Sequence, residues 1–259
     1  MLGVAWHTTK SGIDNAMSDV DNIVVLTGAG ISAESGLSTF RDPEGIWAKY
    51  DISEVATPQA FAADPELVHN FYNYRRREAQ KVSPNAAHYA LADLEHEVSA
   101  RGGSLTLVTQ NVDDLHRRAG SNAILQMHGA LQKVRCVACA DVHQWSDDLS
   151  IEVSCPSCGQ RGCLRPDIVW FGEMPRFMEE IDEAMSEASL FVSIGTSGAV
   201  YPAAGLVSIA KQMGIETCEL NLEPSANASI FDRGIYGPAA TIVPAFVNEM
   251  LDLEPKSVT

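Results

Sequence analysis

The chain has 259 residues, of which 46% are hydrophobic, and it carries a formal net charge of −16. This hydrophobic content is sufficient for a buried core, whereas the excess of acidic residues argues against a nucleic-acid-binding surface, which needs clustered lysine and arginine. No apolar run reaches the roughly 18 residues that cross a bilayer, and the first residues resemble neither a secretory nor a transit peptide, so we expect a cytoplasmic protein with no membrane partner.

The first predicted element is a buried strand over Ile23–Leu26, which is followed by Gly28-Ala29-Gly30. A strand that ends in Gly-x-Gly frees backbone N–H groups to face a phosphate, although a tight strand-to-helix turn without a ligand has the same pattern. The segment that follows ends in Phe40-Arg41-Asp42. An aromatic ring, a cation and an anion at one loop end suggest a ligand that has both a ring and charge.

The next segment, residues 47–82, carries two helix starts, Thr57-Pro58 and Asp64-Pro65, and no convincing strand. In the second helix Arg75 shares a face with apolar residues and with Tyr72, whereas Arg76 and Arg77 are expected in solvent. Arg75 can be a solvated side chain at the edge of the core. Alternatively, its guanidinium is placed to bind a carboxylate, with the Tyr72 hydroxyl as a second donor.

The remaining chain alternates between short apolar runs and helical patterns. A helix is predicted from Ser83-Pro84 to Gly102-Gly103, and two others over Phe177–Ala188 and Pro202–Met213. Further strands are predicted at Leu105–Val108, Ile124–Met127, Leu190–Ile194, Thr217–Leu222 and Thr241–Val243. This alternation predicts an α/β fold with a doubly wound, Rossmann-like parallel sheet.

Four of the six cysteines form two Cys-x-x-Cys pairs with the spacing of a tetrahedral zinc site, namely Cys136, Cys139, Cys155 and Cys158. Four thiolates leave no open position for water, so we expect one structural zinc. Cys163 and Cys218 are expected to be buried. We predict that residues 47–82 and 132–165 form a smaller domain of a helical module and a zinc ribbon, beside a large domain of residues 1–46, 83–131 and 166–259.

Ligands of open α/β sheets bind beyond the carboxyl ends of the strands, and polar residues follow five of the predicted strands. They are Thr27–Gly30, Thr109–Asp113, His128-Gly129, Gly195-Thr196-Ser197 and Asn221-Leu222-Glu223. Each fragment alone is compatible with an ordinary polar turn, but together they predict a nucleotide site. A lone histidine is more often structural than catalytic, yet a neutral His128 at this edge can take a proton from a hydroxyl.

These segments, with the four cysteines and the runs Gln126–Gly129 and Pro166–Glu173, resemble the sirtuin family of NAD-dependent protein-lysine deacylases. The match keeps its order over nearly the whole chain. The resemblance implies a catalytic role for His128 as general base on the ribose hydroxyls, and for Asn111 and Asp113 in holding the nicotinamide. It further implies NAD contacts from Gly28, Ala29, Gly30, Ser32, Phe40, Arg41, Gln110, Asn111, Asp113, Gly195, Thr196, Ser197, Asn221, Glu223 and Ala239.

The resemblance also implies the substrates and products. A protein segment that carries an acylated lysine would bind as an added strand between Val169–Glu173 and Gly198–Val200. The products would be free lysine, nicotinamide and 2′-O-acyl-ADP-ribose. Tyr72-x-x-Arg75 with Ala60 resembles the sirtuin branch that removes succinyl, malonyl and glutaryl groups. The substrate contacts would come from Ala60, Tyr72, Arg75, Val169 and Phe171.

Several alternatives stay open at this point. A deacetylase with little activity on acidic acyl groups and a protein ADP-ribosyltransferase share the same NAD chemistry. The Gly-x-Gly turn also permits a nicotinamide-dependent dehydrogenase, and the cysteines alone permit a zinc-ribbon binding module without catalysis. The sequence does not determine the oligomeric state, and a monomer is compatible with it.

Overall fold

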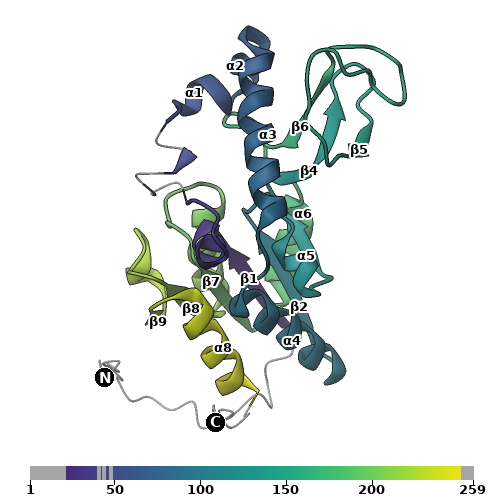
Figure 1. Ribbon diagram of the computed structural model, residues 1–259. Helices are drawn as coiled ribbons and strands as arrows, with labels where there is room; N and C mark the ends of the chain where they lie inside the picture. Colours follow the sequence, from purple (N-terminus) through teal and green to yellow (C-terminus); the bar gives the residue numbers. More distant parts are fainter. Residues whose placement is uncertain (1–21, 40–41, 43–44, 47–48, 252–259) are drawn as a thin grey trace.

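A computed structural model of the chain describes residues 22–39, 42, 45–46 and 49–251 (Figure 1). Its main feature is a six-stranded sheet in which every pair of neighbouring strands is parallel, with the order β3-β2-β1-β7-β8-β9. The strands are β1 (Asn22–Thr27), β2 (Ser104–Thr109), β3 (Ile124–Gln126), β7 (Leu190–Ile194), β8 (Glu216–Asn221) and β9 (Arg233–Tyr236). This sheet confirms the predicted α/β class.

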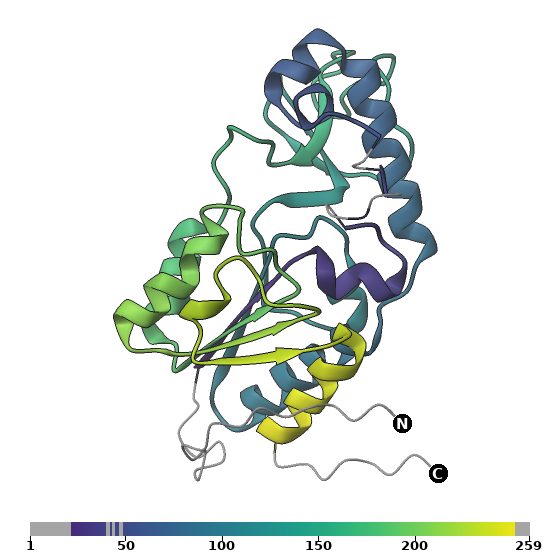
Figure 2. The same ribbon diagram turned by 90° about the vertical axis from the view of Figure 1, so that its left-hand side faces the viewer.

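Helices cover both faces of this sheet (Figure 2). On one face α4 (Ala86–Ala100) and α8 (Ala239–Met250) pack on Ile23 and Val25 of β1. On the other face α6 (Met178–Glu187) and α7 (Leu206–Met213), which follows the short helix η3 (Ala203–Gly205), pack on Val24 and Leu26. Successive strand residues point to opposite faces of the sheet, so the residues on each face must be apolar to pack against the helices there. This explains why the strands read as continuous apolar runs.

Two sequence predictions about these elements were wrong. Thr241–Val243, predicted as a strand, lies in α8, and the sixth strand is β9 instead. The β-branched run favours a strand locally, but the longer apolar face of the helix buries Val243, Phe246 and Val247 in the core. The predicted helix start at Ser83-Pro84 is also displaced, because Asn85 caps α4 and its side chain accepts from the Ala87 N–H at 2.9 Å.

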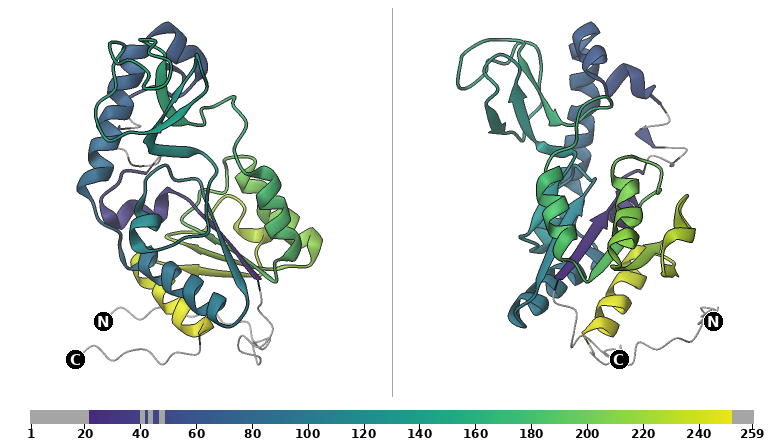
Figure 3. Two further views of the ribbon diagram at one scale, coloured as in Figure 1. Left: turned by 90° about the vertical axis from the view of Figure 1, so that its right-hand side faces the viewer. Right: turned by 180° about the vertical axis from the view of Figure 1, so that it is seen from behind.

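A second group of elements lies at one end of the molecule (Figures 1 and 3). It contains the helices α1 (Ile52–Val55), α2 (Pro58–Ala63) and α3 (Pro65–Lys81). It also contains an antiparallel sheet of β5 (Val142–Gln144), β4 (Gly129–Cys136) and β6 (Leu164–Ile168). Thr57 and Asp64 accept hydrogen bonds at the starts of α2 and α3, as the predicted helix starts require.

Arg76 of α3 is buried, so the prediction that it lies in solvent was wrong. Its Nε donates to the Leu131 carbonyl at 2.7 Å, and its Nη1 donates to Asn73 Oδ1 at 2.9 Å and to the Asp147 carbonyl at 3.1 Å. Leu131 lies on β4 and Asp147 in the segment after β5, whereas Asn73 belongs to α3 itself. Arg76 therefore ties α3 to the small sheet.

The remaining short helices are η1 (Ala29–Ser35), α5 (Leu115–Ala119) and η4 (Ala228–Ile230). Among the residues that the structure describes, no helix combines the length and the apolar character needed to span a membrane. One junction matters for the site: β3 of the large sheet ends at Gln126, and β4 of the small sheet begins at Gly129. His128 therefore lies where the chain passes from one sheet to the other.

Candidate active site

The loops after β1 and β7 pack backbone against backbone. The Gly28 N–H donates to the Ile194 carbonyl at 3.0 Å, and the Gly30 N–H donates to the Gly195 carbonyl at 2.9 Å. A Cβ on Gly30 would lie 2.7 Å from Gly195 Cα, closer than real side chains approach. Glycine is thus required by this contact, which brings Ala29 of one loop and Thr196 of the other to the same edge of the sheet.

Ser32, Asn111 and Asp113 form a buried hydrogen-bonded cluster behind this edge. Asn111 Nδ2 donates to the Gly28 carbonyl at 3.1 Å and to Ser32 Oγ at 3.2 Å, and Ser32 Oγ donates to Asp113 Oδ2 at 3.2 Å. Burial raises the pKa of Asp113, although the Leu115 N–H and the Ser32 hydroxyl oppose this by donating to the carboxylate. The cluster fixes an amide and a carboxylate beside the glycine loop.

Two buried histidines support this cluster, and the sequence analysis missed both. His88 Nε2 lies 3.4 Å from Ser32 Oγ, His116 Nε2 lies 3.0 Å from Thr27 Oγ1, and the two rings are 4.8 Å apart. Burial lowers the pKa of His88 to about 4 and that of His116 well below its ordinary value. The burial of His88 could have been predicted from helical periodicity, because His88 precedes Leu91 by three residues and so lies on the apolar stripe of α4.

We expect the two histidines to make the fold sensitive to acid. A histidine whose pKa is lower in the folded state is neutral in both states above its unfolded pKa, so its contribution to stability is complete above pH 6.5 and is lost as pH falls toward 4. For His88 alone, the free energy of unfolding should drop by about 2 kcal/mol between pH 7.5 and pH 5. Urea unfolding at the two pH values measures this, and His88→Gln should show a smaller drop than the unaltered protein. An equal drop in both proteins would contradict the role of His88.

His128 presents one ring nitrogen as a proton acceptor. Its Nδ1 lies 3.1 Å from the Gln110 carbonyl, and because a carbonyl only accepts, Nδ1 carries the proton and Nε2 keeps a lone pair. Burial lowers the pKa of His128, and the hydrogen bond to Gln110 opposes this shift. The ring is therefore neutral at physiological pH. The His128 carbonyl also accepts from the Val169 N–H at 2.9 Å.

The other predicted nucleotide contacts lie along the same edge of the sheet. Asn221 Nδ2 donates to the Thr196 carbonyl at 2.7 Å, so the amide joins the ends of β7 and β8. Ser197 Oγ accepts from the Ala199 N–H, Glu223 is exposed, and Ala239 is the first residue of α8. Phe40 and Arg41 lie outside the described residues.

Tyr72 and Arg75 lie together on α3. The Tyr72 side chain is 1% exposed, and its oxygen accepts from Trp170 Nε1 at 2.9 Å. The Arg75 Cζ is 5.7 Å from the centre of the Tyr72 ring. Ala60 belongs to the same apolar cluster as Tyr72 and Trp170.

Burial shifts the pKa values of the Tyr72 and Arg75 side chains in opposite directions. Burial raises the pKa of Tyr72 to about 12, so its hydroxyl stays protonated. Burial lowers the pKa of Arg75, and the Tyr72 oxygen and the Asp113 carboxylate oppose this. The electrostatic interaction with Asp113 connects Arg75 to the cluster beside the glycine loop.

Trp170 is itself fixed by an ion pair that the sequence analysis did not identify. Arg165 donates from both terminal nitrogens to Glu173, at 2.7 and 2.9 Å, and its Cζ lies 3.3 Å from the centre of the Trp170 ring. Glu173 also accepts from the Trp170 N–H at 2.8 Å. Phe171, the next residue, is 46% exposed and donates its N–H to the Ala56 carbonyl.

The four cysteines of the predicted zinc site come together at the end of β4, where Cys136 meets three cysteines from the segments that connect β4, β5 and β6. Their sulfurs all lie within 4.8 Å of one another, and the Cys136–Cys158 and Cys139–Cys155 Sγ distances are both 3.8 Å. A tetrahedral site with Zn–S bonds of about 2.3 Å places its sulfurs roughly 3.8 Å apart. The four cysteines therefore fit one zinc ion. Cys163 and Cys218 are buried, as expected.

We expect Cys158→Ser to remove most of the bound zinc and to lower Tm by several degrees, because about 1 kcal/mol corresponds to roughly 2–4 °C in a chain of this size. Zinc content by elemental analysis and Tm by calorimetry measure the two effects. Cys218→Ser is the matched control, because it changes a buried thiol in the large sheet and should keep the zinc. Zinc retained at one per chain in Cys158→Ser would contradict the site.

Comparison with known proteins adds four similarities. The model of the Sir2 family matches residues 28–202. An NAD-dependent protein deacylase of Caulobacter vibrioides is 55% identical over 235 residues, which cover 91% of this chain and 99% of the relative. A solved Sir2 homologue–NAD complex is 38% identical with a TM-score of 0.81 and covers 90% of this chain and 91% of its own. The structure of Sir2Af2 bound to a myristoylated histone peptide is 33% identical with a TM-score of 0.70, over 90% and 92% of the two chains.

Proposed function

Because the chain belongs to the Sir2 family and is an NAD-dependent protein deacylase, we propose that it removes succinyl, malonyl or glutaryl groups from protein lysines, and acetyl groups as well. The observation that carries this proposal is the pairing of a buried Tyr72 hydroxyl with the Arg75 guanidinium on one face of α3. A hydroxyl and a guanidinium are the donors that a carboxylate at the end of an acyl chain needs.

The Trp170 indole determines what the Tyr72 hydroxyl can do. Its N–H donates to the Tyr72 oxygen at 2.9 Å, so the hydroxyl hydrogen remains available for an acceptor. The raised pKa keeps that hydrogen in place at physiological pH. Tyr72 would therefore act as a donor toward an acyl carboxylate beside Arg75.

NAD, when bound, supplies the ADP-ribosyl group that receives the acyl group as nicotinamide leaves. The backbone around Gly28 and Gly30, with Thr196 and Ser197 from the opposite loop, would hold the phosphates. Asn221 and Glu223 would contact the adenosine ribose, and Ala239 would face the adenine. The Ser32 hydroxyl donates to Asp113 and accepts from Asn111, so it holds both side chains in place. Asn111 and Asp113 would orient the nicotinamide amide.

His128 would act as the general base. Nε2 keeps its lone pair because Nδ1 is committed to the Gln110 carbonyl, and a neutral imidazole can take a proton from a ribose hydroxyl. The acylated lysine would enter beside Val169, whose own N–H is held by the His128 carbonyl. The Val169 carbonyl would then accept from the lysine side-chain N–H.

A panel of lysine peptides that differ only in the acyl group tests the proposal. With saturating NAD, we expect kcat/KM for succinyl-, malonyl- or glutaryl-lysine to equal or exceed kcat/KM for acetyl-lysine. Nicotinamide release measures turnover for every peptide by the same readout. If kcat/KM for each of the three acidic acyl groups were less than about one hundredth of kcat/KM for acetyl-lysine, the proposed removal of acidic acyl groups would be refuted. The enzyme would then be a simple deacetylase.

A further inference from the structure

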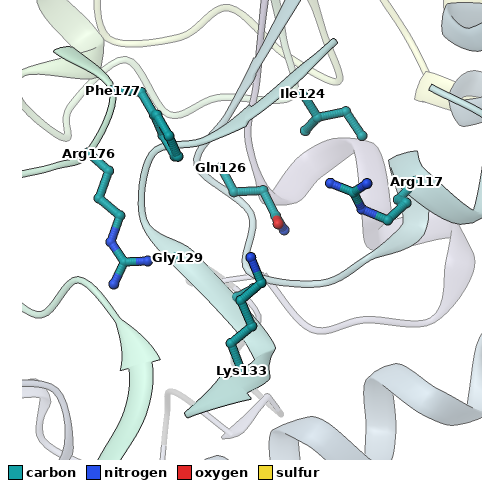
Figure 4. A pocket seen from close by; sticks show the side chains of 8 residues that line it. Arg117, Ile124, Gln126, Gly129, Lys133, Arg176 and Phe177 are labelled. Atoms are coloured by element: carbon teal, nitrogen blue, oxygen red, sulfur yellow. The ribbon is translucent and has the colours of Figure 1, made fainter. Parts of the chain in front are cut away.

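A small cavity lies beside β3 and the start of β4, and the reaction described above does not use it (Figure 4). Its volume is about 100 Å³. Such a volume holds a few water molecules, and it is well below the roughly 300–1,000 Å³ of pockets for drug-sized ligands. The cavity therefore admits a small group and not a whole nucleotide.

Three cationic side chains line this cavity, and each comes from a different element. Arg117 lies on α5, Lys133 on β4, and Arg176 two residues before α6. Figure 4 shows the Gln126 amide between the Arg117 and Lys133 side chains. The cavity offers donors on several sides in a chain whose formal net charge is −16.

Only one of these cations is neutralised within the part of the chain that the structure describes. Arg176 donates to both carboxylate oxygens of Asp167, at 2.7 and 2.5 Å. Neither Arg117 nor Lys133 has a described carboxylate within 4.0 Å. Two positive charges around one small cavity exclude a metal cation and favour an anion.

The backbone at the edge of the cavity is also unusual. Phe177, which lines it, has φ 61° and ψ 26°, a left-handed conformation that bulky residues rarely adopt. Such a conformation persists only where the surrounding structure imposes it, and it is enriched at ligand sites. Phe177 is 38% exposed, so burial of its ring does not explain the conformation.

We propose that this cavity binds a small oxyanion, either a phosphate or a carboxylate group, through Arg117 and Lys133, with Gln126 as a neutral donor. Arginine and lysine bind such groups by charge-assisted hydrogen bonds. The cavity is linked to the catalytic edge: Gln126 Nε2 donates to the Asp113 carbonyl at 3.1 Å, and Gly129, which follows His128, lines the cavity. The amide of Gly129 is therefore a local reporter of occupancy.

Titration of the full chain with sodium phosphate or sodium acetate at constant ionic strength, with sodium chloride as the reference salt, tests this site. ADP-ribose is added to saturation so that the glycine loop cannot take the phosphate. We expect a saturable shift of the Gly129 amide resonance with at least one of the two anions. A response to phosphate alone identifies a phosphoryl site, and a response to acetate identifies a carboxylate site.

Arg117→Gln with Lys133→Gln should weaken that binding at least tenfold. The matched control, Lys81→Gln with Arg161→Gln, removes two exposed cations elsewhere and should bind as the unaltered protein does. No saturable shift beyond that of chloride in the unaltered protein would overturn the proposal. Equal binding by the Arg117/Lys133 variant would overturn it as well.

Discussion

Replacing His128 by alanine should lower kcat for deacylation about 10²- to 10⁴-fold, the usual contribution of a positioned general base. The expected size follows from the geometry of the ring. Its Nδ1 is held by the Gln110 carbonyl, so Nε2 is the acceptor, and burial lowers its pKa so that the neutral form dominates near pH 7. Among the described residues, His128 is the histidine that is partly exposed and lies between β3 and β4, at the junction of the two sheets.

The measurement is nicotinamide release and deacylated peptide under saturating NAD, with Tm and NAD affinity determined on the same preparation. We expect NAD affinity to change less than about threefold, because the loops around Gly28 and Gly195 do not depend on His128. His96→Ala, which alters an exposed histidine of α4, is the control and should keep full activity. Turnover of His128→Ala within tenfold of the unaltered protein would refute the role as base.

The large sheet was largely predictable because its strands are buried on both faces. Runs such as Ile23–Leu26 and Leu190–Ile194 have no polar face, which is the pattern expected of strands that helices cover on both sides. β9 was missed because it is a short edge strand with alternating exposure. Thr241–Val243 was wrongly predicted as a strand because its β-branched residues favour a strand locally. The packing of α8 on α4 outweighs this local preference.

The site was predictable where one segment carries the signal. The cysteine spacing is such a case, and so are the polar residues that follow five of the predicted strands, which parallel pairing places at one edge of the sheet. The burial of Arg76 was not predictable, because it depends on the carbonyls of Leu131 and Asp147, which lie far along the chain. The bond from Trp170 to Tyr72 joins residues 98 positions apart, and helical periodicity carries no information about it. The division into two domains stays a prediction.

Replacing Arg75 by methionine should lower kcat/KM for succinyl-lysine peptides about 10- to 100-fold and leave kcat/KM for acetyl-lysine within about threefold. A hydrogen bond to a charged group is worth about 1.5–3 kcal/mol, and about 1.4 kcal/mol corresponds to a factor of ten. Methionine keeps much of the side-chain volume against Phe71 and Tyr72. It removes the charge that an acyl carboxylate needs, whereas an acetyl group makes no such contact.

Two further variants separate a role in acyl recognition from a role in folding. Arg77→Met removes a guanidinium from the exposed side of the same helix, where it pairs with Asp148, and should leave both activities unchanged. Tyr72→Phe removes the second donor and the acceptor of the Trp170 N–H, so it should also lower succinyl turnover more than acetyl turnover. Equal losses for both peptides in Arg75→Met would show that Arg75 supports the fold of α3 or the nearby Asp113. In that case the carboxylate would have to be bound elsewhere, or the enzyme would act on neutral acyl groups.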